Sequence, residues 1–167
     1  GMAVRVQGSV RFDTFMNEYV LFVNSLAKKE KKSREDHAEV KRVELHAHTT
    51  MSSMDAVVSV KDLIKTADRW GWPAVAVTDH GVVQAFPDAA KALSSCKSNL
   101  KVIYGMEGYL VQQDHLQKRA NHIIMLAKNP NGLRNLYQLV SLAHLRYFHR
   151  QPRLPKHIIE EYRSCLL

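Results

Sequence analysis

Hydrophobic and polar positions follow recognisable periods from about residue 43 onward, and each stretch predicts one secondary-structure element. Residues 43–49 alternate between apolar and polar side chains, which predicts a short strand. Residues 60–70 carry apolar side chains at helical spacing and Gly71 follows them, which predicts an amphipathic helix with a glycine stop. Residues 73–78 form a continuous apolar run, which is typical of a buried parallel strand.

The same succession of elements continues towards the C-terminus. A second helix is predicted from residue 82 to about residue 93, with Pro87 either in its first turn or at a kink. Residues 100–106 predict a strand that ends at Glu107, and residues 122–127 predict a neighbouring strand. The order strand, helix, strand, helix, strand indicates right-handed crossovers and therefore an α/β protein with a parallel sheet or barrel.

Side chains that bind metals occur at the ends of these predicted strands. His46 and His48 are two residues apart, so both imidazoles would leave the same face of one strand. Imidazole suits zinc, manganese or iron, and two histidines with one carboxylate form a common catalytic metal site. Because the carboxyl ends of parallel strands meet at one rim, we predict one metal-binding site with the ligands His46, His48, Asp55, His80, Glu107 and His122.

A second interpretation of these six polar residues is purely structural. Each polar residue could merely end a strand, but that interpretation needs several independent coincidences along the same rim. Asp79 precedes His80, and we predict that it orients the site without binding metal, which makes it the candidate catalytic residue. Five further histidines lie outside the pattern and are not expected to bind metal: His37, His115, His144, His149 and His157.

Composition agrees with one folded unit. The chain has 167 residues, of which 46% are hydrophobic, which is enough for a core. No run is long enough to span a membrane, and no secretory signal precedes the predicted elements. Cys96 and Cys165 are widely separated, so we expect reduced thiols in a cytoplasmic protein.

The formal charge of +8 indicates a polyanionic partner. Residues 28–34 are basic, and a solvated linker explains them better than an arm that grips phosphates. Residues 146–153 interleave aromatic side chains with arginines and could stack on a single strand of nucleic acid. These residues follow a helix that Asn129 caps and Pro130 starts, so arginines solvating the helix end explain them equally well.

Several of these sequence phrases together resemble one known family. They are His46-Ala-His48, Asp55, Thr78-Asp-His-Gly81, Gly105-Met-Glu107 and the run that begins at His122. They are similar to the PHP (polymerase and histidinol phosphatase) domain of bacterial replicative polymerases. More narrowly, they resemble the PolC-type DNA polymerase III alpha subunit of Gram-positive bacteria. Residues 11–24 resemble the end of that family's OB domain.

This resemblance implies a fold and a set of metal ligands. The fold would be an incomplete PHP-type (β/α)7 barrel, preceded by a β remnant of an OB domain. Residues 1–36 would be the OB remnant and a basic linker, and residues 37–167 the N-terminal part of the PHP domain. His46, His48 and Glu107 would hold a first divalent metal, Glu107 with His122 a second, and Asp55 with His80 a third. DNA and replication proteins would be the partners of the parent polymerase.

The chain also departs from the PolC pattern. The family carries a proofreading exonuclease at a position where this chain has only residues 112–121. The family's further metal ligands, a cysteine and an Asp-x-His pair, would follow Leu167. Cys165 is not equated with that cysteine. We therefore expect one metal at the first position and weak or empty positions elsewhere. We interpret Gly1-Met2 as a tag remnant and expect a fragment that ends before the polymerase domain. The open barrel edge predicts a homodimer or an exchange of elements between copies.

Three functions from different classes agree with these observations. The first is a fragment of a DNA-directed DNA polymerase (a nucleotidyltransferase) that contains its PHP domain. That domain would have either a structural role or weak metal-dependent phosphoesterase or pyrophosphatase activity. The second is a stand-alone PHP phosphoesterase of the histidinol phosphatase type, which the OB-like residues disfavour. The third is a non-catalytic scaffold that its metals stabilise.

Overall fold

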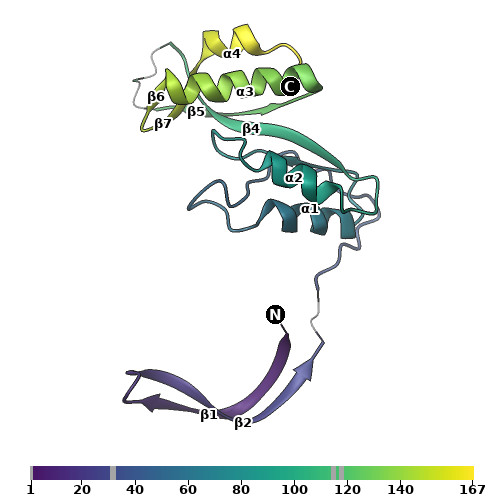
Figure 1. The fold of residues 1–167 in the computed structure, drawn as a ribbon, viewed down its shortest axis with the longest axis vertical. Coiled ribbons are helices and arrows are strands. Elements are labelled where there is room, and N and C mark those ends of the chain that lie inside the picture. Colours follow the sequence, from purple (N-terminus) through teal and green to yellow (C-terminus); the bar gives the residue numbers. More distant parts are fainter. Residues whose placement is uncertain (1, 31–32, 114–115, 117–118) are drawn as a thin grey trace. The chain divides into compact units, whose positions relative to one another are not determined.

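The computed structural model describes residues 2–30, 33–113, 116 and 119–167, and its contacts divide the chain into two compact units. The units are Gly1–His37 and Ala38–Leu167 (Figure 1). Part of the basic segment 28–34, namely residues 31 and 32, lies outside the described residues, as does His115.

The first unit is a β-hairpin of β1 (Ala3–Asp13) and β2 (Glu18–Lys29), which pair antiparallel. The Asp13 carboxylate accepts hydrogen bonds from the backbone N–H groups of the turn. Phe12 faces Tyr19 across the two strands, and their rings meet edge to face with centroids 5.3 Å apart. Both side chains remain at least 49% exposed, so one face of the hairpin presents apolar groups to solvent.

The second unit contains a mixed sheet. It consists of β3 (Ala74–Val77), β4 (Lys101–Val111), β5 (Asn121–Leu126), β6 (Phe148–His149) and β7 (Gln151–Pro155). β3 and β7 pair with β4 in parallel, whereas β5 pairs with β4 antiparallel. The sheet is therefore mixed at β5, whereas the order of elements predicted a parallel sheet or barrel. Residues 112–120 are too few to carry a crossover between parallel strands, whereas an antiparallel return needs only a short connection.

Four helices cover this sheet: α1 (Val60–Arg69), α2 (Phe86–Leu93), α3 (Pro130–Leu145) and α4 (Lys156–Tyr162). The side chains of Ser59 and Asn129 cap α1 and α3. Gly71 has a φ of +72°, a left-handed conformation that suits the glycine stop predicted there. In the described part of the chain, no helix has both the length and the apolar character needed to cross a membrane.

The start of α2 differs from the prediction. The helix begins at Phe86 and not at residue 82. Pro87 occupies its first turn, where a missing backbone N–H costs no hydrogen bond, so the proline starts the helix instead of kinking it.

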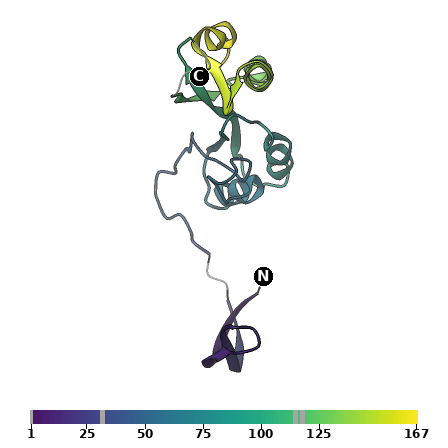
Figure 2. The same cartoon turned by 90° about the vertical axis from the view of Figure 1, so that its left-hand side faces the viewer.

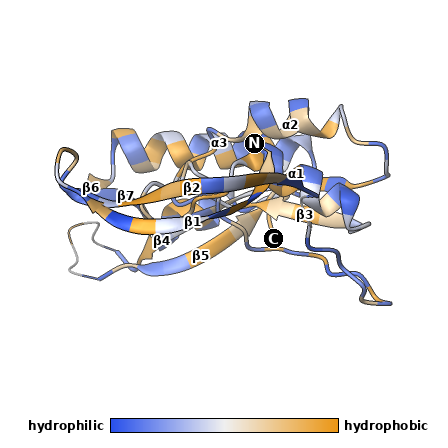
Figure 3. Cartoon of the chain, turned by 90° about the horizontal axis from the view of Figure 1, so that it is seen from below, coloured by the Kyte–Doolittle hydropathy of each residue, from blue (hydrophilic) through white to orange (hydrophobic). Residues whose placement is uncertain are grey.

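The helices pack on different parts of the sheet around one core. Figures 1 and 2 show α1 beside α2, and α3 beside α4. The first pair lies near β3, which α1 contacts, and both helices of the second pair contact β7. In Figure 3, β3 is apolar along its whole length, whereas the helices carry both apolar and polar residues. The core includes the fully buried side chains of Val75, Met106, Leu136 and Leu154.

The segment at residues 43–49 is extended but forms only an isolated bridge, so the prediction of a regular strand was wrong. Glu44 bridges to Val75, and two backbone N–H groups of the β3 region, those of Ala76 and Thr78, donate to carbonyls of this segment. Glu107 lies within β4 and not at its end, because pairing with β5 and β7 prolongs the strand beyond the predicted limit.

Leu136→Ala is expected to destabilise the second unit by about 2–5 kcal/mol, because Leu136 is fully buried and its truncation leaves a cavity. Leu145→Ala on the same helix is the matched control, since Leu145 is 88% exposed and its loss should change stability little. Urea unfolding followed by circular dichroism measures both. Equal losses of stability in the two variants would contradict the core described here.

Candidate metal centre

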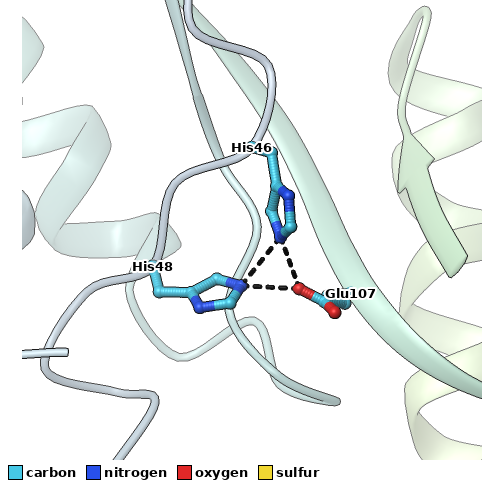
Figure 4. Close-up of side chains that lie close together, drawn as sticks. All are labelled: His46, His48 and Glu107. Atoms are coloured by element: carbon cyan, nitrogen blue, oxygen red, sulfur yellow. Dashed lines mark hydrogen bonds and ion pairs between the residues drawn. The ribbon is translucent and has the colours of Figure 1, made fainter. Parts of the chain in front are cut away.

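Three imidazoles converge on the buried carboxylate of Glu107. Figure 4 shows two of them, His46 and His48. His46 Nε2 lies 2.5 Å and His48 Nε2 2.7 Å from Glu107 Oε2. His122 Nδ1 contacts the other carboxylate oxygen. The glutamate side chain is 3% exposed. One carboxylate therefore gathers side chains that are far apart in the sequence.

Backbone hydrogen bonds fix the positions of these side chains. The segment that carries His46 and His48 is held at Ala47, whose N–H donates to Thr78 Oγ1 and whose carbonyl accepts from the Thr78 N–H. The Glu107 N–H donates to the Asp79 carbonyl, and the Gly81 N–H donates to the Glu107 carbonyl. These two bonds form a parallel bridge that brings His80 beside Glu107.

A second carboxylate lies on the outer side of the cluster. Asp55 Oδ2 is 2.7 Å from His48 Nδ1 and 3.1 Å from His80 Nε2. Hydrogen bonding to His48 is the main cause that lowers the pKa of Asp55 below its ordinary value. His48 thus lies between the two carboxylates, with one ring nitrogen directed at each.

All six predicted ligands fall into three overlapping groups whose donor atoms lie within 4.8 Å of one another. The groups are His46, His48 and Glu107; His48, Asp55 and His80; and His80, Glu107 and His122. Each group combines imidazole nitrogens with a carboxylate oxygen, the donor set that suits zinc, manganese or iron. The chemistry of the residues present therefore fits divalent metal ions.

The environment of Glu107 keeps it ionised. Burial alone would raise its pKa, but the hydrogen bonds with His46, His48 and His122 outweigh burial and lower the pKa to about 2. The carboxylate is thus negatively charged over the whole physiological range, which is the state that a metal ligand requires.

Asp79 does not contact the ligand side chains directly. It is buried, and its carboxylate accepts hydrogen bonds from Thr49 N, Thr49 Oγ1 and Ser52 Oγ at 2.6, 2.8 and 2.7 Å. Ser52 Oγ in turn accepts a hydrogen bond from the His80 N–H. Asp79 therefore fastens the loop between His48 and Asp55 to the end of β3.

Tyr109 also belongs to the centre, although the sequence prediction missed it. Its ring stacks on that of His80 with an interplanar angle of 13°, and it meets His122 edge to face. Burial raises the pKa of its hydroxyl. The signal was present in the sequence, because Tyr109 follows Glu107 by two residues and therefore lies on the same face of β4.

Four further histidines can be compared with these groups. Among the described residues, none of His37, His144, His149 and His157 joins a group that could hold a metal. His144 Nε2 instead lies 2.9 Å from the Gly81 carbonyl, which links α3 to the backbone just after His80.

Comparison with known proteins supplies relatives of this chain. PolC-type DNA polymerase III of Staphylococcus aureus is 42% identical over 153 residues, which cover 86% of this chain and 10% of that protein. The polymerase of S. aureus strain MW2 matches to the same extent. The chain thus spans about a tenth of the length of the relatives it matches.

A solved structure of a candidate metal-dependent phosphoesterase from Bifidobacterium adolescentis is 19% identical, with a TM-score of 0.47. The match covers 62% of this chain and 33% of that one. Its TM-score is too low to establish a common fold. By contrast, the sequence model of the PHP domain matches residues 44–167, which include every residue of the centre described above. The chain therefore belongs to the PHP domain family, and its PHP region is similar to that of PolC-type DNA polymerase III.

Proposed function

We propose that the second unit is a metal-dependent phosphoester hydrolase centre within a PolC-type replicative DNA polymerase. The observation that carries the proposal is the set of three overlapping ligand groups built on Glu107, His48 and His80. A centre with shared ligands can hold neighbouring divalent ions, an arrangement that recurs in phosphoester hydrolysis.

In this proposal, His46, His48, Asp55, His80, Glu107 and His122 hold the metal ions. Divalent ions in such a site supply Lewis-acid activation of water and neutralise charge on phosphoryl oxygens. The protein contributes fixed ligands, because Glu107 is buried and orients the imidazoles, while Asp55 is half exposed at the solvent side. A phosphoester would therefore approach from the side of Asp55, His46 and His122, whose side chains are the more accessible ones.

Asp79 is a positioning residue in this proposal. Its three hydrogen bonds hold residues 49–52, and through Ser52 it also fixes the His80 backbone. The loop would otherwise leave His48 and Asp55 free to separate. Asp79 thus supports catalysis without touching the substrate.

The similarity to PolC-type polymerases supports a wider context. We propose that residues 1–36 are the remnant of an OB domain with a basic linker, and that residues 37–167 are the N-terminal part of a PHP barrel. The exposed apolar face of the β1–β2 hairpin supports this, since a two-stranded hairpin alone is marginally stable and its apolar face needs a cover. DNA and replication proteins would be partners of the parent polymerase, in the cytoplasm. Dimerisation or element exchange stays a prediction.

One observation also favours a second function, a non-catalytic scaffold. The candidate ligands come from the 43–49 segment, the loop that follows it, the end of β3, and β4 and β5, so bound metal would cross-link most of the sheet. Metal binding would then stabilise the fold whether or not a phosphoester is hydrolysed.

His46→Ala is expected to abolish manganese-dependent hydrolysis of bis(p-nitrophenyl) phosphate, because it removes one ligand of the group that includes His48 and Glu107. Absorbance of released nitrophenol measures the rate, and metal analysis measures bound ions. His157→Ala is the control, since His157 is exposed on α4 and lies outside the ligand groups. Wild-type protein that binds manganese but hydrolyses nothing would favour the scaffold.

Asp79→Asn is expected to weaken metal binding about 10- to 100-fold, the usual cost of losing a group that orients ligands. The amide keeps the size of the side chain but cannot accept all three hydrogen bonds that the carboxylate receives. Isothermal titration with manganese measures the change in affinity. Unchanged affinity would show that the loop at residues 49–52 holds its place without Asp79.

Metal-free protein is expected to lose stability in acid through Glu107. The pKa of this carboxyl is lowered from 4.5 to about 2 in the folded protein. Its contribution to the free energy of unfolding is therefore fully present above about pH 4.5 and declines as the pH falls towards 2. The difference in unfolding free energy between wild type and Glu107→Gln should therefore shrink from about pH 5 to about pH 3. Urea unfolding with chelator present checks this, and a constant difference would contradict it.

A further inference from the structure

The β6–β7 hairpin carries a strained arginine at its tip. His149 pairs with Gln151, so Arg150 alone makes the turn between the two strands. Arg150 has a φ of +63°, a left-handed conformation that non-glycine residues adopt rarely and that tends to mark functional positions. Its side chain is exposed, so packing does not explain why an arginine stands at this position.

Arg150 lines a pocket of about 450 Å³ together with His149, Gln151, Arg153 and Leu116. Among the described residues, the lining includes two arginines and one histidine. Arg153 is only 4% exposed, so this lining residue is held in a buried position. Guanidinium groups match the geometry of phosphate oxygens, so the pocket suits a phosphate group.

The hairpin is built directly against the metal centre. Arg153 is the register partner of Tyr109, whose ring stacks on His80 with centroids 5.7 Å apart. Pro152 of the hairpin packs closely against Gly81, the residue that follows His80. A Cβ atom added to Gly81 would lie only 2.5 Å from Pro152 Cγ. The pocket and the metal ligands are therefore joined by close contacts through Tyr109 and Gly81.

We propose that this pocket binds a phosphate group that neighbours the one hydrolysed at the metal centre, with Arg150 determining this specificity. This inference rests on the proposed function and extends it to a substrate class. The substrate carries at least two successive phosphates, as in an oligonucleotide strand or a nucleotide polyphosphate. A simple monoester would reach the metal centre but leave the pocket empty.

The test separates phosphate binding from hydrolysis. Binding of a fluorescein-labelled oligo(dT) to metal-free protein is measured by fluorescence anisotropy at fixed salt, with chelator present. Arg150→Asn should weaken binding about tenfold, because it removes a charge-assisted contact while asparagine tolerates the left-handed backbone. Arg150→Lys should retain much of the affinity. Arg134→Asn removes the same charge from an exposed position on α3 and should change binding less than about twofold.

Competition identifies the source of the phosphate. Displacement of the labelled strand by pyrophosphate, lost in Arg150→Asn, would indicate a nucleotide polyphosphate, whereas displacement only by unlabelled oligo(dT) would indicate a strand. Equal weakening in Arg150→Asn and Arg134→Asn would overturn the inference, because the effect would then be one of net charge. Oligonucleotide binding that depends on Arg150 without any manganese-dependent hydrolysis would instead overturn the proposed function alone.

Discussion

The ionised carboxylate of Glu107 is the constraint around which the second unit is organised. A charge with only 3% of its side chain exposed is costly unless hydrogen bonds compensate it, and here His46, His48 and His122 do so. His46 and His48 come from the 43–49 segment, whereas His122 comes from β5. The fold is therefore required to bring the 43–49 segment, β4 and β5 to one point.

The sheet meets this requirement through the length and pairing of β4. Its first half pairs in parallel with β3, which presents His80, and its second half pairs with β5 and β7. Glu107 lies where the neighbours of β4 change, so ligands can arrive from both edges of the strand. A strand that stopped at Glu107 would have no position for His122. The antiparallel return of β5 is thus what completes the cluster.

Around this centre, polar side chains without ligand roles hold the geometry. Asp79 fastens the 49–52 loop, Thr78 holds Ala47, and Tyr109 packs between two candidate ligands. The same residue, Tyr109, faces Arg153 of the hairpin that lines the cationic pocket. The candidate metal centre and the β6–β7 hairpin are therefore joined through Tyr109.

The sequence by itself determined the features that depend on local patterns. The helical spacing of apolar residues predicted α1, and Gly71 predicted its end. Asn129 as the N-cap and Pro130 as the first helical residue predicted the start of α3. The types and spacing of His46, His48, His80 and Glu107 predicted which chemistry to expect, because donor atoms are properties of the side chains themselves.

Only the tertiary structure decided where β4 ends, in which direction β5 runs and which side chain holds the loop at residues 49–52. The limits of β4 depend on pairing with strands that are distant in sequence, and the role of Asp79 depends on a loop that folds back over it. The left-handed backbone of Arg150 likewise follows from the tight return of β6 into β7. Such features arise from hydrogen bonds and packing between residues far apart in the sequence, which the local pattern of apolar and polar residues does not encode.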